Sequence, residues 1–186
     1  MARCYSDAMN PRQPLPNIWV ISDARNDAVL EQALRRLPRG SGLVFRHYHL
    51  DEEARWERFR VLLALCRSLG HVAVLSGDAG LARDWDADGI YGAVDRLDPA
   101  TGLLRFATVH DAQEIAAAND AVVDGQFLSP VFPTRSHPGA PHLGVDRFRE
   151  LAALSNCPVI AMGGMDAERA AALNWPRWAA IDAFLR

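Results

Sequence analysis

The 186-residue chain contains no lysine, because all 20 of its basic residues are arginine. Without lysine the chain cannot form a Schiff base with a carbonyl substrate, and it cannot build a phosphate-binding loop that ends in Gly-Lys-Ser/Thr. Arginine still binds phosphate through its planar guanidinium, but it does not supply a nucleophilic amine. The composition therefore excludes amine chemistry and leaves anion binding open.

Cysteine is also scarce, and long apolar runs are missing. Cys4, Cys66 and Cys157 are an odd number of thiols without a C-x-x-C spacing, which indicates reduced structural cysteines in a cytoplasmic protein. The N-terminal residues lack the apolar stretch of a signal peptide, and the longest dense apolar run, residues 61–66, is too short to span a bilayer. A net charge of −3 gives no reason to expect nucleic acid or a membrane as partner.

From residue 18 onward, short β-rich runs alternate with helical patterns. The expected strands are residues 18–23, 42–50, 71–77, 89–94, 103–110, 121–131, 158–164 and 178–185. Repeated βα units force parallel pairing, because each crossover carries a helix. The pattern predicts one compact (β/α)8 TIM barrel over residues 18–186 after an N-terminal tail of residues 1–17, with an open doubly wound sheet as the alternative.

The last expected strand runs almost to residue 186, so the barrel is expected to lack its final helix. An uncovered apolar strand face is a liability in solution. We therefore expect either the N-terminal tail or a second copy of the chain to cover that face, and the second possibility predicts a homodimer.

Ligands of such barrels bind at the C-terminal ends of the strands, where two segments carry anion-binding chemistry. Gly163 and Gly164 end the seventh strand with bare backbone N–H groups, which favours phosphate, although a simple tight turn is the alternative. The loop of residues 132–144 offers hydroxyl, guanidinium and imidazole groups to an anion, from Thr134, Arg135, Ser136 and His137. The alternative for this loop is a solvated surface segment.

Histidines near the same ends raise a third possibility, a zinc hydrolase. His47 and His49 form an H-x-H at the end of the second strand, and further histidines lie on the same rim: His110, His137 and His142. A zinc hydrolase needs several such ligands to converge. Strand alternation opposes this arrangement, because if Arg46 faces the barrel interior, His47 and His49 face the helices.

Several segments resemble the thiamine phosphate synthase family, which includes the related thiazole tautomerases. The stretches LSPVFPTRSHPGAPHLG and PVIAMGGMDAERAAAL carry the likeness, and DADGIYG and TVHDAQE resemble the family's fourth-strand and fifth-strand motifs. The likeness covers about residues 18–186. It implies a (β/α)8 barrel of thiamine biosynthesis that joins hydroxymethylpyrimidine diphosphate to thiazole phosphate, with release of pyrophosphate and with Mg²⁺ bound.

The resemblance also implies roles for individual residues. Gly163 and Gly164 match the cradle of the thiazole phosphate, and Thr134 and Ser136 match the hydroxyls that hold the pyrophosphate. The catalytic candidates are Arg46, Thr108, His110 and His137, and the further substrate-binding candidates are Trp19 and Arg135. The expected partners are therefore small phosphorylated thiazole and pyrimidine ligands.

The chain departs from the family where charge matters most. Tyr48 stands in place of a strand-two lysine, His137 in place of the lysine after T-x-T, and Asp182 in place of a phosphate-binding serine. The only candidates for the two Mg²⁺-binding aspartates are Asp78, one position late, and Asp95. We therefore expect a thiamine phosphate synthase-like transferase whose activity is reduced or lost.

Two alternatives stay open beside this expectation. The first is a non-catalytic protein that binds thiazole phosphate or thiamine phosphate, or regulates through it, on the same barrel. The second is a thiazole tautomerase-like isomerase. The tautomerase histidine is replaced here by Ser129 and Pro130, so His110 or His137 would have to act as the base.

Overall fold

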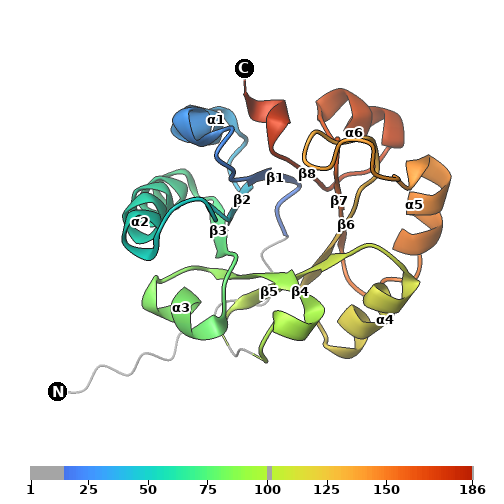
Figure 1. Cartoon of the computed structure of the whole chain (residues 1–186), viewed down its shortest axis with the longest axis horizontal. Helices are drawn as coiled ribbons and strands as arrows, with labels where there is room; N and C mark the ends of the chain where they lie inside the picture. The colour runs from blue at the N-terminus through green and yellow to red at the C-terminus, as the bar shows by residue number, and fades with distance from the viewer. Residues whose placement is uncertain (1–14, 100–101, 186) are drawn as a thin grey trace.

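In the computed structural model, which describes residues 15–99 and 102–185, eight parallel strands close into a barrel in chain order (Figure 1). The pairing of the last strand with the first completes the closure. The (β/α)8 prediction is therefore confirmed, and the open-sheet alternative is wrong. The strands are β1 (Ile18–Ile21), β2 (Gly42–Phe45), β3 (Val72–Leu75), β4 (Gly89–Ala93), β5 (Leu104–Val109), β6 (Gly125–Leu128), β7 (Val159–Met162) and β8 (Trp178–Ala180).

Helices alternate with these strands and surround them as an outer ring (Figure 1). The α-helices are α1 (Leu30–Arg36), α2 (Glu52–Leu69), α3 (Ala79–Asp84), α4 (Ala112–Asp120), α5 (Gly144–Ala152) and α6 (Ala167–Leu173), and the 3-10 helices are η1 (Asp27–Val29), η2 (Val94–Arg96) and η3 (Asp182–Phe184). Two residues mark the ends of α2: the Asp51 carboxylate accepts from the Ala54 N–H at its start, and Gly70 ends it with φ 68°.

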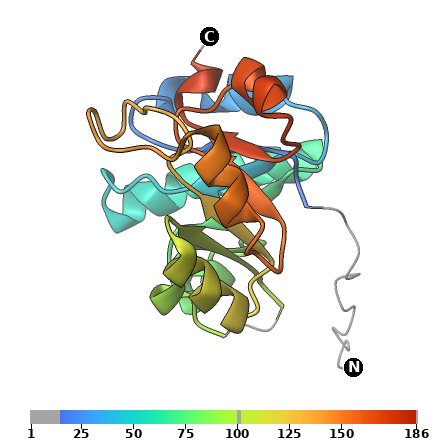
Figure 2. The same ribbon diagram turned by 90° about the vertical axis from the view of Figure 1, so that its right-hand side faces the viewer.

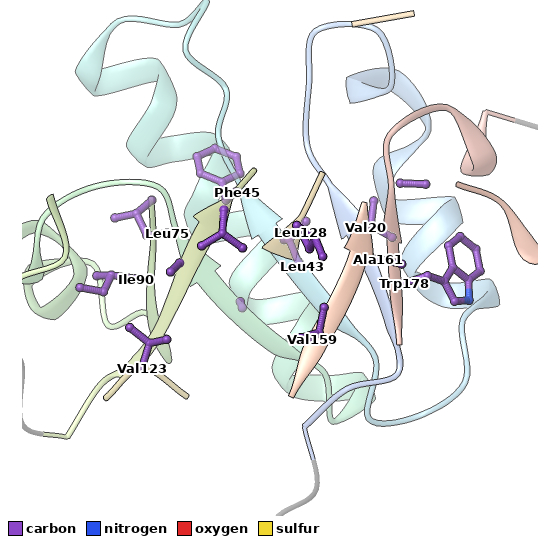
Figure 3. Packing of buried hydrophobic residues seen from close by; sticks show 14 of the residues in the cluster. Val20, Leu43, Phe45, Leu75, Ile90, Val123, Leu128, Val159, Ala161 and Trp178 are labelled. Atoms are coloured by element: carbon purple, nitrogen blue, oxygen red, sulfur yellow. The ribbon is translucent and has the colours of Figure 1, made fainter. Parts of the chain in front are cut away.

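Alternate strand positions build two hydrophobic layers, as the period of two in a strand requires. One layer fills the barrel interior and consists of Trp19, Ile21, Val44, Val74, Tyr91, Phe106, Phe127, Ile160 and Ala179. The other lies between the strands and the helices, where Figure 3 shows the side chains of Val20, Leu43, Phe45 and Leu128 among others. Because the interior is packed with apolar side chains, polar chemistry is left to the loops at the strand ends.

Trp19 fills the N-terminal end of the barrel interior. Its side chain is fully buried, its indole Nε1 donates to the Pro16 carbonyl at 3.0 Å, and its ring packs edge-on against Phe106. Gly42 is its partner across the β1–β2 register, and a Cβ there would overlap the Trp19 ring. Glycine at this position therefore makes room for the indole.

All eight strands are shorter than the sequence predicts, and in β2 and β8 the residues beyond the strand adopt another conformation. β2 ends at Phe45 instead of continuing to residue 50, and His47 has a φ of 35°, which no strand residue adopts. β8 ends at Ala180, and the chain then forms η3 instead of an eighth helix. The Phe184 ring of η3 stacks on Trp178 with 5.6 Å between ring centroids. The chain thus covers part of the last strand with its own residues.

Most of the predicted N-terminal tail lies outside the described residues. Of its described end, Leu15 packs against the interior cluster and the Asn17 carbonyl accepts a hydrogen bond from the Trp178 N–H at 2.9 Å. These contacts attach the segment to the N-terminal end of the barrel. Within the described ranges, no helix combines the length and the apolar character needed to cross a bilayer.

Candidate functional site

A pocket with a volume of about 1290 Å³ opens at the C-terminal ends of the strands and extends along the outer face of β1 and β8, where Ile18, Leu37 and Trp178 line it. The loop between β6 and α5, which projects from the barrel in Figure 2, forms part of its wall. Three-quarters of the predicted site residues come together here. Those that line the pocket are Arg46, Thr108, His110, Thr134, Arg135, Ser136, His137, Gly163 and Gly164.

Gly163 and Gly164 form a part of the pocket wall where side chains do not fit. Their φ values are 90° and 63°, which disfavour any residue with a Cβ. A Cβ on Gly163 would lie 2.6 Å from Pro130, and one on Gly164 would collide with the Pro133 carbonyl. The pair therefore exposes main chain to the pocket, as an anion-binding turn requires.

Arg169 adds a positive charge beside these glycines. It belongs to the first turn of α6, lines the pocket and donates a hydrogen bond from Nη1 to the Gly164 carbonyl. Its guanidinium carbon lies 5.3 Å from the centroid of the Phe132 ring. Sequence reasoning did not select Arg169, and its position five residues after Gly164 is the only signal that could have indicated it.

Arg25, also missed from the sequence, joins three separate segments at this end of the barrel. Its Nε donates to Asp23 at 2.9 Å, its Nη1 reaches Asp182 at 3.3 Å, and its Nη2 donates to the Ser136 hydroxyl at 2.8 Å. Asp182 therefore has a cationic partner where it lines the pocket. No local pattern indicates Arg25, because two of its partners lie more than a hundred residues away in the chain.

Arg46 and Tyr48 form the opposite side of the pocket. Arg46 donates to Asp23 at 3.2 Å, and its guanidinium lies 5.8 Å from the centroid of the Tyr48 ring. The Tyr48 hydroxyl is 2.6 Å from the Ser76 hydroxyl, and 69% of Tyr48 is exposed. Burial raises the pKa of Asp23, but the hydrogen bonds and charge of Arg25, together with the charge of Arg46, outweigh this and lower it. Arg46 is thus held by a carboxylate that stays ionised.

His110 is the side chain in the pocket best arranged for proton transfer. Its Nδ1 lies 2.8 Å from Glu114, and the same carboxylate oxygen accepts the His110 backbone N–H at 2.7 Å. The carboxylate fixes the ring, and Nε2 is left for the pocket that His110 lines. Tyr91 lies deeper, where burial raises its pKa to about 12, so its phenol stays neutral.

The predicted Mg²⁺ ligands are not brought together, which corrects the sequence assignment. The Asp78 carboxylate caps α3 by accepting from the Leu81 N–H at 2.8 Å, and Asp95 is an exposed residue of η2. Neither is among the residues that line the pocket. The carboxylates that do line it in the described ranges follow β7 and β8: Asp166, Glu168 and Asp182.

Two further predictions are corrected or sharpened by the structure. Trp19 does not line the pocket, because its indole is buried at the N-terminal end of the barrel, so its assignment as a substrate-binding residue is wrong. His47 is fully buried against Phe45, outside the pocket that contains His110. A hydrolase site that combines His47 and His49 with His110 is therefore not formed, as the strand alternation predicted.

Comparison with known proteins agrees with this geometry. Residues 18–180 match the family described as thiamine monophosphate synthase. A thiamine-phosphate synthase of Azoarcus sp. (strain BH72) is 30% identical over 164 residues, which cover 83% of this chain and 80% of that protein. One from Geobacillus thermodenitrificans (strain NG80-2) is 26% identical over 186 residues, covering 93% of this chain and 83% of that protein.

The solved structures include similar barrels of related description. A thiamine phosphate pyrophosphorylase from Pyrococcus furiosus superimposes with a TM-score of 0.76 and 22% identity, covering 91% of this chain and 87% of that chain. At that identity the superposition supports the fold alone, whereas the family match and the Azoarcus relative rest on sequence. The chain belongs to the thiamine monophosphate synthase family and is thiamine phosphate synthase-like.

Proposed function

We propose that this chain joins hydroxymethylpyrimidine diphosphate to a thiazole phosphate, releasing pyrophosphate, as a slow transferase of thiamine biosynthesis. The observation that carries the proposal is the convergence of three groups on one pocket. These groups are the exposed main chain of Gly163 and Gly164, the hydroxyls of Thr134 and Ser136, and the guanidinium groups of Arg46 and Arg135. The first suits a monophosphate, and the other two suit a diphosphate.

The reaction needs negative charge to be stabilised on the leaving group. The bond between the pyrimidine methylene carbon and the diphosphate oxygen breaks, and a bond from the thiazole nitrogen to that carbon forms. The electron pair of the broken bond goes to the diphosphate, where Arg46 and Arg135 supply positive charge and, with His137, hydrogen bonds. No proton needs to be removed from the thiazole nitrogen, so His110 serves to orient or to donate to the departing oxygens.

Magnesium fits this pocket poorly. Mg²⁺ takes carboxylate ligands together with substrate phosphates, but Asp78 caps a helix and Asp95 is exposed on η2. One preorganised donor to the developing charge is worth about 3–4 kcal/mol, so two missing carboxylates and the absence of lysine lower the rate by several orders of magnitude. The proposed enzyme is slow for this reason.

A second candidate is a protein that binds the thiazole phosphate without turnover. Gly163 and Gly164 line the pocket and form what we call its phosphate end, whereas the Mg²⁺ candidates Asp78 and Asp95 do not line it. Asp182 lines the pocket there, where the family resemblance places a serine. A phosphate with two charges meets this carboxylate and its Arg25 partner, so its affinity depends on the balance of these two charges. Binding without product would support this candidate.

Calorimetric titration and a single-turnover assay separate the two candidates. Thiazole phosphate, thiamine phosphate and the pyrimidine diphosphate are each titrated, and the two substrates are then mixed with excess protein, with and without Mg²⁺. We expect binding of thiazole phosphate and slow formation of thiamine phosphate. Binding without product would contradict the transferase and favour the binding protein, and no binding of any ligand would contradict both.

A matched pair of arginine variants links the activity to the pocket. Arg135→Gln removes a guanidinium from the pocket wall, so it should slow turnover about tenfold or more. Arg147→Gln removes an exposed guanidinium that pairs with Glu150 on α5, so it should leave turnover unchanged. Equal effects of the two variants would contradict the proposed pocket.

We further propose that the protein is a cytoplasmic homodimer. The reduced thiols expected from the odd cysteine count support the compartment, and the apolar outer face of β8, which is followed by the short η3 among the described residues, supports the dimer. The stacking of Phe184 on Trp178 reduces the exposed strand face, so this contact is the competing explanation. Light scattering on the purified chain distinguishes a dimer from a monomer.

A further inference from the structure

Asp27, His47 and His49 meet outside the pocket, where η1 approaches the segment that follows β2. The ligand atoms of the three side chains all lie within 4.8 Å of one another. The histidines are those of the H-x-H at the end of the second strand, which the pocket does not use. The structure thus supplies a third donor to this pair, and it is a carboxylate of the β1–α1 connection instead of His110.

The donor types match a transition metal. We propose that Asp27, His47 and His49 form a structural binding site for one divalent transition metal ion, with Zn²⁺ as the best fit. Two imidazoles and one carboxylate are common ligands of Zn²⁺, whereas Mg²⁺ and Ca²⁺ prefer sets made of oxygen. The site is therefore distinct from the Mg²⁺ site of the family in both place and chemistry.

The distances need only small adjustments to accept the ion. With zinc–ligand bonds of about 2.0 Å in tetrahedral geometry, ligand atoms lie about 3.3 Å apart. His47 Nε2 and Asp27 Oδ1 are 2.8 Å apart, and the rings of His47 and His49 have centroids 4.9 Å apart. The exposed His49 side chain can rotate toward the other two, and a water molecule would complete the coordination.

A hydrogen bond to Ser22 already orients the buried His47 ring. The Nδ1 of His47 lies 2.7 Å from the Ser22 hydroxyl, which also accepts the backbone N–H of Arg46 at 2.8 Å. With a metal ion on Nε2, the ring proton stands on Nδ1 and is donated to Ser22. Such a hydrogen bond to the second ring nitrogen is the usual partner of a metal-bound histidine.

Arg58 is the group that competes with the ion. Its Nε donates to the same Asp27 oxygen at 2.6 Å, and its Nη1 and Nη2 pair with Glu31 at 2.5 and 3.0 Å. Together Asp27, Glu31 and Arg58 carry one net negative charge, which attracts a cation. The hydrogen bonds of Arg58 to Glu31 and to the Asp27 carbonyl can persist when the ion takes the carboxylate.

An ion here would fix the segment that follows β2 on the side that faces away from the pocket. Asp27 is attached to α1 through η1, while His47 and His49 flank Tyr48 and follow Arg46, both of which line the pocket. The ion would thus tie the β1–α1 connection to the residues that carry these two side chains. Its effect is expected on stability and on the order of this segment, not on the reaction itself.

The test is direct titration of the metal-free full chain with Zn²⁺ against a chelating dye. We expect one equivalent bound with a micromolar or lower Kd. His49→Ala should weaken binding at least tenfold, and because His49 is exposed the variant should still fold. Arg58→Gln should strengthen binding several-fold, a change in the opposite direction that a general loss of structure cannot produce.

Controls address the other histidines and thiols. His142→Ala and Cys157→Ser should each leave the affinity unchanged, and Co²⁺ substitution should give an absorption spectrum without a thiolate band. Binding that survives His49→Ala, or that disappears with Cys157→Ser, would overturn the proposal. So would the absence of stoichiometric binding. None of these results changes the outcome expected for thiazole phosphate, because the two sites share no side chain.

Discussion

The Nη1 of Arg25 lies 3.3 Å from the carboxylate of Asp182, which links the connection after β1 to the connection after β8. The same guanidinium donates to Ser136 in the long loop after β6. The hydrogen bond with Asp23, followed by the charge of Asp182, raises the pKa of Arg25, so the cation is permanent. One arginine thus both offsets the negative charge at the phosphate end and holds the loop that carries the hydroxyls.

This pairing predicts opposite effects for its two members. Asp182→Ser removes a negative charge from the pocket and should tighten thiazole phosphate binding about tenfold, or about 1.4 kcal/mol. Arg25→Gln leaves the Asp182 charge without its cation and releases Ser136, so it should weaken binding by a similar factor. Calorimetric titration measures both changes.

The double variant tests whether the two effects share one cause. If Arg25 acts mainly by offsetting Asp182, the loss caused by Arg25→Gln should shrink markedly in the Asp182→Ser background. Equal losses in both backgrounds would show that Arg25 acts on the phosphate or on Ser136 independently. Weaker binding by Asp182→Ser alone would contradict the electrostatic argument.

Gly164 predicts a loss of phosphate affinity when a side chain is added. Gly164→Ala places a Cβ against the Pro133 carbonyl at a φ of 63°, so the turn must shift. Thiazole phosphate affinity should fall at least tenfold, and the unfolding free energy should fall by about 1–2 kcal/mol. Gly139→Ala is the matched control, because its φ is 76° but nothing lies within 4 Å of the added Cβ. The control should lose stability without losing affinity.

The ion pairs of Arg58 predict a pH-dependent stability. The hydrogen bond from Arg58 lowers the pKa of Glu31 below its ordinary value of 4.5. This contribution to stability is present above about pH 4.5 and is lost as the pH falls through the lower pKa of the folded state. Arg58→Gln should therefore cost about 1 kcal/mol at neutral pH, a value reduced by the partial exposure of Glu31.

Urea denaturation of the metal-free protein from pH 3 to 7 measures this difference. The gap between wild type and Arg58→Gln should be largest near pH 7 and smallest near pH 3. Arg60→Gln is the control, because Arg60 pairs with Glu57 at an exposed position and should cost less than about 0.5 kcal/mol. A gap that grows toward acid pH would contradict the assignment.

The fold was predictable because strand and helix patterns alternate regularly along the sequence. The depth at which a side chain lies within the barrel was not predictable. Alternation places Trp19 and Ile21 on the same interior face, yet only the structure shows that Trp19 occupies the N-terminal end. Gly42 carried a usable signal, since a strand glycine often marks close approach by a large neighbour. The family resemblance placed Trp19 in the site because it matches residues by their position along the strand, which does not show where a side chain packs.

The pocket was predictable in its main-chain and loop residues, and less so in its charges. Gly163 and Ser136 are adjacent to recognisable motifs, whereas Arg25 reaches Ser136 and Asp182 across distant parts of the chain. No local pattern encodes such a contact. The reverse holds for Asp78, which looked like a metal ligand in sequence but has its carboxylate committed to the start of α3.

The last prediction returns a lysine to this lysine-free chain. Tyr48 lies in the pocket wall where the family resemblance places a lysine, and its side chain is largely exposed, so Tyr48→Lys should fold. The ammonium group would add positive charge near the diphosphate, and single-turnover formation of thiamine phosphate should become about tenfold faster. Tyr48→Phe removes only the hydroxyl that contacts Ser76 and is expected to leave the rate within about twofold. A lysine variant no faster than the phenylalanine variant would show that the diphosphate does not bind beside residue 48.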